Sequence, residues 1–354
     1  DQKEAAVVER DSDIVTWRAL TPDHAVALAD LIACIERVDD PPYRTSLDEI
    51  VELLSNMSKW RGVIGELNET GTYVAFSIIT TRFVGVPECV CQGGVHPDFR
   101  RRGIGRSLIE WQTRTSTEIL RVLAERKELP DDEPVGVRAP HIETGMVTPD
   151  SDAIGRIVTH VDMGHEELEE HLRELDYHWS NTYFELRADL ESVPQMPELN
   201  AYLQVAPWDD MWEDPVRRAA NRLADQEWGR PPQSMEQWLM GRTAFAPQWS
   251  FVALDRSGDR PQVAGFLLAS RYEQDWAALG WSEGYIDQMG VLEKWRNAGV
   301  VEALIIASMR AQKDDDMDKT GAGLGSANHS GALAVYDGLG FHVVGESRLY
   351  ALDV

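Results

Sequence analysis

The chain has 354 residues, of which 34 are Lys or Arg and 60 are Asp or Glu, so its formal net charge is −26 at pH 7. The length favours two domains, because a single hydrophobic core rarely extends beyond about 250–300 residues. The negative charge argues against nucleic acid as a general partner, since binding phosphates requires concentrated lysine and arginine.

The sequence pattern also argues against membrane insertion and secretion. No apolar run approaches the roughly 20 residues of a membrane helix, and the N-terminal residues lack the basic-then-apolar pattern of a signal peptide. The three cysteines, Cys34, Cys89 and Cys91, are too few for a disulfide framework. We therefore expect a cytoplasmic protein with reduced thiols and no membrane partner.

The first half begins with a predicted strand at 13–20, and Thr21 is a suitable N-cap for the helix that follows. The remaining predicted elements are a helix at 46–57, strands at 61–68, 72–83 and 88–95, a long helix from residue 104, a strand at 155–164, a helix at 165–177 and a strand at 180–190. Residues 127–152 are rich in proline and acid, which predicts an irregular insertion.

The second half repeats this order after a proline-containing linker at 191–200. Its predicted elements are a strand at 201–208, a helix at 214–228, strands at 250–256, 262–272 and 283–291, a helix within 294–312, a strand at 321–326, a helix within 331–341 and a strand at 342–352. Two halves in the same order indicate a tandem duplication, with domains at 1–193 and 194–354. Mixed strands and helices favour an α/β sheet in each half.

The stretch "VHPDFRRRGIGRSL" is the strongest local signal of a ligand site. A strand ends at Val95, and Gly103 and Gly105 then expose backbone N–H groups where a helix begins. Such amides form an anion site, and glycine lets a phosphate come close. Three arginines add positive charge in front of the glycines: Arg100, Arg101 and Arg102. The stretch matches neither the nucleoside-triphosphate loop nor the dinucleotide pattern Gly-x-Gly-x-x-Gly.

This loop resembles the signature of the GNAT superfamily of acyl-CoA-dependent N-acyltransferases. That signature is a strand ending in Val-x-Pro, followed by Arg/Gln-x-x-Gly-x-Gly/Ala at the start of a helix. The first half matches it completely with Val95, Pro97, Arg100, Gly103 and Gly105.

The second half matches the same signature in part. Val291, Arg296 and Gly299 agree, but Val301 replaces the last Gly/Ala and Lys294 stands near the expected proline. Further on, "ANHSGALAVYDGLGF" is similar to the Asn-x-x-Ala-x-x-x-Tyr-x-x-x-Gly-Phe ending of the family. The resemblance covers nearly the whole chain as two copies, an arrangement also found in mycothiol synthase-like enzymes.

The resemblance implies two GNAT-like domains, each with a central, mostly antiparallel sheet flanked by helices. It also implies acetyl-CoA as cosubstrate, bound by its diphosphate at the loop. No metal is expected, because His160, His165 and His171 do not have the spacing of a His-Glu-x-x-His site. The residues that the resemblance assigns to cosubstrate binding are Val95, Arg100, Arg101, Arg102, Gly103, Ile104, Gly105, Val291, Arg296, Asn297, Ala298, Gly299, Val301 and Asn328.

Attack of an amine on a thioester requires a base for the amine, a polar group for the oxyanion and an acid for the thiolate. Tyr336 resembles the general-acid tyrosine of the family; the alternative is a tyrosine that packs on the sheet. Asp287 is the first candidate for the base and Glu283 the second, because family members often carry a carboxylate on this strand. The alternative for both is a solvated carboxylate.

The first half lacks these groups when residues are counted back from the end of its strand. The count gives Pro87, Cys89 and Cys91, and Leu172 stands where the tyrosine is expected. We therefore predict that the second half is catalytic and that the first half is a structural or CoA-binding relic. The predicted function is transfer of an acetyl group to a primary amine of a small molecule by a monomer or homodimer; the alternative is a non-catalytic acyl-CoA-binding or regulatory protein.

Overall fold

The computed structural model describes residues 14–55, 60–83, 85–127, 152–228, 232–325 and 331–354. The chain forms two compact units. The described part of the first unit lies within residues 14–181 together with Ser347–Val354, and the second unit lies within Thr182–Glu346. Most of the predicted insertion at 127–152 lies outside the described residues.

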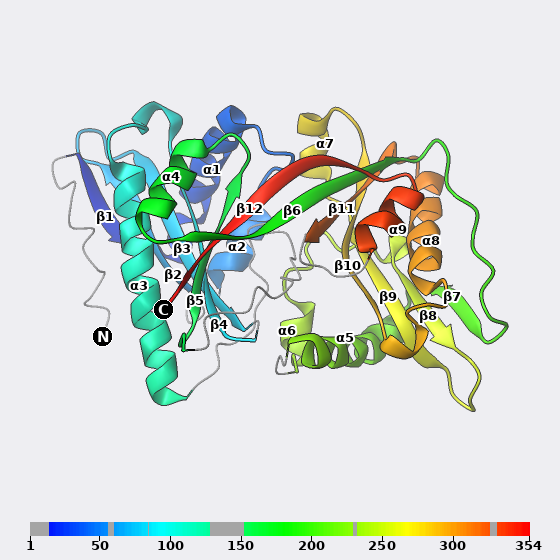
Figure 1. Cartoon of the computed structure of the whole chain (residues 1–354). Coiled ribbons are helices and arrows are strands. Elements are labelled where there is room, and N and C mark those ends of the chain that lie inside the picture. Colours follow the sequence, from blue (N-terminus) through cyan, green and yellow to red (C-terminus); the bar gives the residue numbers. More distant parts are fainter. Residues whose placement is uncertain (1–13, 56–59, 84, 128–151, 229–231, 326–330) are drawn as a thin grey trace. The chain divides into compact units, whose positions relative to one another are not determined.

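The first unit contains a sheet with helices on both faces (Figure 1). Its elements are β1 (Val15–Ala19), α1 (Ala25–Asp39), α2 (Leu47–Ser55), β2 (Trp60–Leu67), β3 (Tyr73–Phe83), β4 (Pro87–Val95), α3 (Ile104–Arg126), β5 (Arg156–Asp162), α4 (Glu166–Glu174), the start of β6 (His178–Asp189) and the end of β12 (His342–Asp353). The pairing order is β1-β2-β3-β4-β5-β12, and every pair is antiparallel except β4 with β5.

In this unit the apolar side chains form two layers, because successive side chains of each strand alternate between the two faces of the sheet. Cys89 and Cys91 of β4 lie in one cluster with Leu108 of α3, whereas Phe76 of β3 lies in another with Leu28 of α1. Successive side chains of a strand point to opposite faces, so the sheet is covered by α3 on one side and by α1 and α2 on the other.

The second unit repeats the same plan. Its elements are the main part of β6, β7 (Leu203–Pro207), α5 (Glu213–Trp228), α6 (Met235–Leu239), β8 (Phe251–Asp255), β9 (Gln262–Ser270), α7 (Glu273–Leu279), β10 (Glu283–Val291), α8 (Val300–Asp314), β11 (Lys319–Gly325), α9 (Ala332–Gly338) and the start of β12. The pairing order is β6-β11-β10-β9-β8-β7, with β10 and β11 as the parallel pair. Short 3-10 turns occur at η1 (Pro22–His24), η2 (Pro97–Phe99), η3 (Asp210–Trp212), η4 (Pro247–Trp249) and η5 (Glu293–Trp295).

Glycines show which helix covers which face of the second sheet. A Cβ atom at Gly265 would lie 3.3 Å from Leu304 of α8, and one at Gly290 would lie 2.6 Å from Leu223 of α5. The two helices therefore approach the strands closely from opposite sides. The predicted fold class, two domains with mostly antiparallel sheets flanked by helices, is confirmed.

The two units exchange their last strands. β6 belongs to the first half of the sequence, yet it pairs with β11 of the second unit, while β12 pairs with β5 of the first unit. Each exchanged strand covers a sheet edge that would otherwise expose unpaired backbone groups. The predicted boundary between residues 193 and 194 thus divides the sequence repeat, whereas the compact units follow strand pairing.

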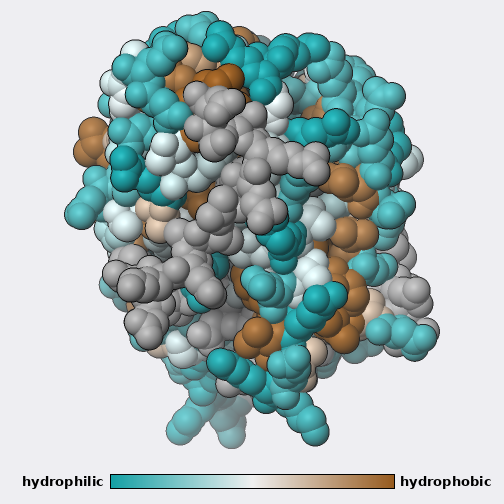
Figure 2. Space-filling view, turned by 90° about the vertical axis from the view of Figure 1, so that its left-hand side faces the viewer, coloured by the Kyte–Doolittle hydropathy of each residue, from teal (hydrophilic) through white to brown (hydrophobic). Residues whose placement is uncertain are grey.

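The short helices α6 and α7 were not predicted. Both are shorter than two turns, too short for a clear 3.6-residue period, and Gly280 ends α7 in a left-handed conformation with φ of 83°. The surface in Figure 2 is mostly hydrophilic, with smaller hydrophobic patches, as expected from a composition with 27% charged residues. None of the described helices combines the length and apolar character needed to cross a membrane.

Candidate functional site

The first candidate feature is the point where β4 and β5 diverge in the first unit. The two parallel strands pair from Glu88 with Arg156 to Cys91 with Thr159. Beyond that point β4 continues along β3, and β5 continues along β12. In the described part of this unit, the edge of β4 from residue 92 to its end therefore lacks a neighbouring strand. The divergence leaves a gap in the ladder of backbone hydrogen bonds.

The loop after β4 leads into the N-terminus of α3. Arg101 and Gly103 adopt left-handed conformations with φ of 63° and 87°, and α3 begins at the next residue. Residues 101–103 are exposed. A Cβ atom added to Gly105 would have a single described neighbour within 4 Å, Cγ2 of Val95 at 3.8 Å. The first backbone N–H groups of α3 are therefore accessible, as an anion site requires.

Arg100 has a different position from the one expected. Its Nε–H donates to the carbonyl oxygen of Val95 at 3.1 Å, and its terminal nitrogens donate to the Asp39 carboxylate at 2.6 and 2.8 Å. This guanidinium, predicted to contact phosphate, instead joins the loop to the end of α1. Its contribution to an anion site would be to hold the loop in place.

Exposed positive charge nevertheless surrounds the start of α3. Arg101 forms a surface ion pair with Glu167, and Arg102 is exposed. Arg106 pairs with Glu174 at 2.7 Å and was not among the predicted residues, although its place in the first helical turn could have indicated it. Surface ion pairs contribute little to stability, so these guanidinium groups can exchange their carboxylate partners for a bound anion.

The second unit repeats the divergence at β10 and β11, with one extra residue. These strands pair in parallel from Glu283 with Lys319 to Ile286 with Ala322. The register of β10 against β9 then shifts at Asp287, which is the extra residue of a β-bulge. β4 pairs with β3 in continuous register from Pro87 to Val95, without such a shift.

Because of this bulge, counting equal numbers of residues does not align β4 with β10. Counting equal numbers of residues back from the strand ends places Pro87 opposite Glu283, but both Glu88 and Glu283 open the parallel ladder of their unit. The first half therefore does carry a carboxylate at this position, which the residue count missed. Glu88 is 3% exposed, and Nε of Arg82 lies 2.8 Å from its Oε2.

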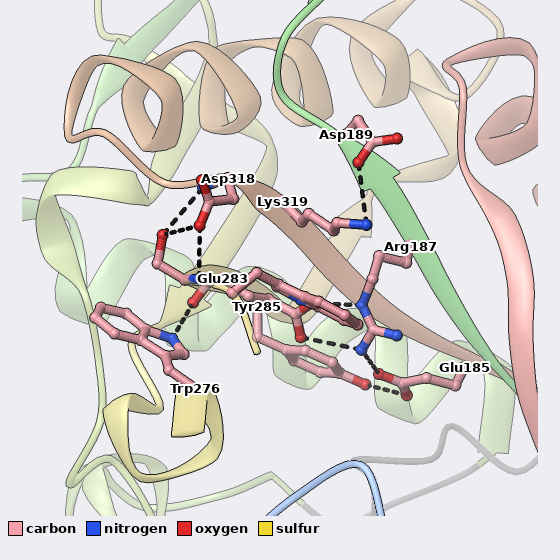
Figure 3. Close-up of polar contacts among 10 residues, drawn as sticks. Glu185, Arg187, Asp189, Trp276, Glu283, Tyr285, Asp318 and Lys319 are labelled. Atoms are coloured by element: carbon pink, nitrogen blue, oxygen red, sulfur yellow. Dashed lines mark hydrogen bonds and ion pairs between the residues drawn. The ribbon is translucent and has the colours of Figure 1, made fainter. Parts of the chain in front are cut away.

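Glu283 lies in a buried ion pair with Arg187 of β6 (Figure 3). Nε of Arg187 donates to Oε2 at 2.5 Å, a terminal nitrogen donates to Oε1 at 3.2 Å, and the indole of Trp281 donates to Oε2 at 3.0 Å. Gly321 lies on β11, the strand between β10, which carries Glu283, and β6, which carries Arg187. A Cβ atom there would come within 3.0 Å of Oε1 and 2.8 Å of the Tyr285 ring, so glycine leaves the room that this contact needs.

The ion pair limits what Glu283 can do chemically. Burial lowers the pKa of Arg187, but the hydrogen bond and the charge of Glu283 outweigh that effect, so the pKa lies above its usual value. Breaking this buried ion pair would cost several kcal/mol, because it would leave a buried charge uncompensated. The carboxylate is therefore held in a structural contact, and its role as a base stays a prediction.

Asp287 is the better placed of the two predicted bases. It lies in the bulge at the divergence, it is partly exposed, and both of its oxygens accept from the hydroxyl of Tyr272 at 3.1 Å. The neighbouring Tyr285 donates its hydroxyl to Glu185 at 3.0 Å. A carboxylate held by one hydroxyl keeps lone pairs for a further donor, so the geometry permits a base. This role stays a prediction.

Tyr336 lies in the apolar core of the second unit. It is 5% exposed, and its ring packs edge-on against Phe341 with the centroids 5.0 Å apart. This position agrees with the packing alternative that the sequence left open, while the role as an acid stays a prediction. Asn328, assigned to cosubstrate binding by resemblance, lies outside the described residues.

The second glycine loop is partly covered, since Gly299 is partly buried whereas its counterpart Gly103 is exposed. Arg296 donates from Nε to the carbonyl oxygen of Val291 at 3.3 Å, which repeats the contact of Arg100, and Gly299 has a φ of 73° before α8. A Cβ atom at Gly299 would lie 3.6 Å from Cδ2 of Leu199 and 3.8 Å from Cβ of Pro197. These two residues precede β7 and were not predicted to lie here.

The remaining residues of this loop turn partly inward. Asn297 is exposed, but Ala298 and Val301 pack against the apolar core of the second unit. Lys294, near the place of the expected proline, pairs with Asp255 at 3.2 Å. The start of α8 therefore has uncharged residues at 297 and 298 and a partly buried glycine, in contrast to the start of α3.

Metal-ligand clusters and cysteine thiols are two other kinds of reactive group that a site could contain. Among the described residues, no group of three or more His, Cys, Asp and Glu side chains could hold a metal ion. The thiols of Cys89 and Cys91 are buried against Ser116, and burial raises the pKa of both, that of Cys91 to about 12. They stay protonated at neutral pH, so they are poor nucleophiles.

No protein-family model and no curated protein matches the chain in sequence. Its structure, however, is similar to a GCN5-related N-acetyltransferase from Sphaerobacter thermophilus over 96% of this chain and 95% of that one, with a TM-score of 0.66 and 18% identity. A tandem GNAT protein from the clavulanic acid biosynthesis pathway aligns over 96% and 98%, with a TM-score of 0.61 and 14% identity. The chain has a tandem GNAT fold.

The tandem GNAT fold confirms the resemblance predicted from the two glycine loops at the level of architecture. A further similar structure, Saccharomyces cerevisiae N-myristoyltransferase solved with bound myristoyl-CoA, covers 96% of this chain and 79% of its own, with a TM-score of 0.56 and 13% identity. All three similar proteins are named as transferases or GNAT proteins. At these identities the likeness establishes the fold alone.

Proposed function

We propose that the chain is an acyl-CoA-dependent N-acyltransferase that binds the thioester in its first unit and acylates an amine of a small molecule. The observation that carries this proposal is the accessible start of α3 beside the end of β4, where no described strand continues the parallel pairing beyond Cys91. The fold supports it, because similar structures include an N-acetyltransferase and a protein with bound myristoyl-CoA. Acetyl-CoA is the proposed cosubstrate.

The two parts of the first unit suit different parts of an acyl-CoA. The N–H groups around Gly103 and Gly105 offer donors to the diphosphate, and Arg101, Arg102 and Arg106 add positive charge beside it. The pantetheine has amide groups that can pair with the open edge of β4, as a neighbouring strand would. The thioester would then lie near the divergence of β4 and β5.

The reaction follows from that placement. The amine nitrogen attacks the thioester carbon, the C–N bond forms, the C–S bond breaks, and the proton lost by the amine ends on the departing thiolate. A base is needed only to deliver the amine in its neutral form. Three features of the second half favour the first unit for this step: Gly299 is partly covered, Tyr336 is buried, and Glu283 is paired with Arg187.

A matched pair of variants tests where the cosubstrate binds. Gly105→Asp introduces a carboxylate at the proposed diphosphate site and should weaken acetyl-CoA binding at least about 100-fold, which corresponds to about 2.7 kcal/mol. Acidic residues are favourable in the first turn of a helix, so the variant should fold. Gly299→Asp is the control in the second unit, at the glycine that corresponds to Gly103; aspartate is among the residues that tolerate its left-handed conformation, and the variant should leave the affinity unchanged. Isothermal titration calorimetry measures both.

The opposite result would return the site to the second unit. If Gly299→Asp abolishes binding and Gly105→Asp does not, the placement in the first unit is wrong. Release of free thiol from acetyl-CoA, followed with a panel of primary amines, tests the reaction itself. Thiol release that depends on an amine supports the acyltransferase, whereas binding without release supports the non-catalytic alternative.

A further inference from the structure

The segment that joins β6 to β7 follows helix α8 along its length. Nζ of Lys313, in the last turn of α8, donates to the carbonyl oxygen of Glu191 at 2.6 Å. Arg310, one turn earlier, donates to the carbonyl oxygen of Pro194 at 3.4 Å. Figure 1 shows this green segment running beside the orange helix towards β7. Residues 191–199 are called the strap below.

Apolar side chains attach the strap to the second unit. Val193 and Met196 are partly buried against the apolar core of this unit. Pro194 and Pro197 fix their own φ angles and favour extended conformations in the residues before them, so the strap loses little entropy when it docks. The strap is therefore attached to the second unit by hydrogen bonds from the C-terminal end of α8 and by its own apolar side chains.

At its far end the strap reaches the glycine that begins α8. Leu199 and Pro197 lie within van der Waals distance of the position that a Cβ atom of Gly299 would occupy, at 3.6 and 3.8 Å. A bound diphosphate would need to approach backbone N–H groups here to about 2.7–3.2 Å. The strap atoms next to Gly299 are carbon atoms, which offer no hydrogen bond to an anion.

We propose that the strap closes the diphosphate cradle of the second unit, so that each chain holds a single acyl-CoA. This inference rests on the proposed function, because it extends the same cradle chemistry to the second unit. It also accounts for Val301 at the place of the last glycine and for the neutral residues Asn297 and Ala298: a cradle that is closed has no need of glycine or arginine.

The test is the number of acetyl-CoA molecules bound per chain, measured by native mass spectrometry and calorimetry. The double variant Pro197→Gly/Leu199→Gly removes both side chains that face Gly299. Gln195→Gly/Glu198→Gly is the matched control, because these neighbouring residues are exposed and the number of added glycines is the same. Val301→Gly tests the branched side chain by itself.

The opened variant should bind one more acetyl-CoA than the wild type, and Gly299→Asp in that background should remove the additional site. The control and Val301→Gly should keep the wild-type number. Equal numbers for the opened variant and the wild type, two molecules on the wild type, or an additional site in Val301→Gly would each overturn the role of the strap. Failure of the proposed function is separate, since it would appear as no binding to the wild type.

Discussion

The two units contain the same divergence of a parallel strand pair, but they differ in the residues placed around it. In the first unit β4 runs in regular register, and the loop after it is exposed and rich in arginine. In the second unit β10 has a bulge at Asp287, and the start of α8 is covered by Leu199 and Pro197. The difference indicates that a duplicated fold can keep its backbone plan while its two ligand sites become unequal.

A shared feature of the units lies at the opposite end of the same strands. In each unit a buried glutamate opens the parallel ladder, Glu88 in the first and Glu283 in the second, and each is paired with an arginine. Charged residues also join the exchanged strands to their new neighbours, with Arg156 bound to Asp353 at 2.8 Å and Lys319 to Asp189 at 3.2 Å. Both contacts lie between residues that are register partners where the exchanged strand begins or ends its pairing.

The largest effect on stability is expected from Arg187→Met, which tests this shared feature. The change leaves the carboxylate of Glu283 buried without its partner, so the free energy of unfolding should fall by about 3–5 kcal/mol. Urea denaturation measures the loss. The double variant Arg187→Met/Glu283→Leu removes both charges and should recover most of the stability. A double variant as unstable as the single one would contradict the ion-pair explanation.

A loss of stability of intermediate size is expected when the pH is lowered. The first unit has a histidine just after its parallel strand pair, where the second unit has a glycine. His160 follows the last paired residue of β5, whereas Gly323 follows the last paired residue of β11. Burial, together with the charge of Arg82, lowers the pKa of His160 to about 3 from 6.5. The unfolded chain binds this proton first as the pH falls, so stability is complete above about pH 6.5 and decreases below it.

Between pH 7 and pH 5 this histidine should remove about 2 kcal/mol from the free energy of unfolding, at about 1.4 kcal/mol per pH unit below 6.5. Denaturation curves of the wild type and of His160→Gln at several pH values measure the contribution as the difference between their slopes. Parallel pH dependences for the two proteins would mean that His160 is not buried in its neutral form.

The smallest effect on stability is expected when the first loop is given the residues of the second. Arg101→Asn/Arg102→Ala copies Asn297 and Ala298, and asparagine tolerates the left-handed conformation found at 101. Stability should change by less than about 1 kcal/mol, because the replaced side chains are exposed. Acetyl-CoA binding should weaken and depend less on salt, which titrations at several salt concentrations measure. An unchanged salt dependence would mean that neither arginine contributes to acetyl-CoA binding.

The positions of most strands and long helices followed from the sequence, because hydrophobic periodicity and capping residues act over a few neighbours. The strand at 283–291 and the helix that begins after Gly103 are found where the pattern indicated. The glycine loop was also evident, since the arginines and glycines before the helix are neighbours in the sequence. The match to the family signature then indicated the tandem fold.

Other features were decided by residues far apart in the sequence. The bulge at Asp287 depends on pairing with β9, and it changed which glutamates correspond between the halves. The Arg100 contact with Asp39 spans 61 residues, and the ion pair of Arg156 with Asp353 spans 197. Local patterns contain no record of such pairings, so the exchanged strands and the covered start of α8 became apparent only in the tertiary structure.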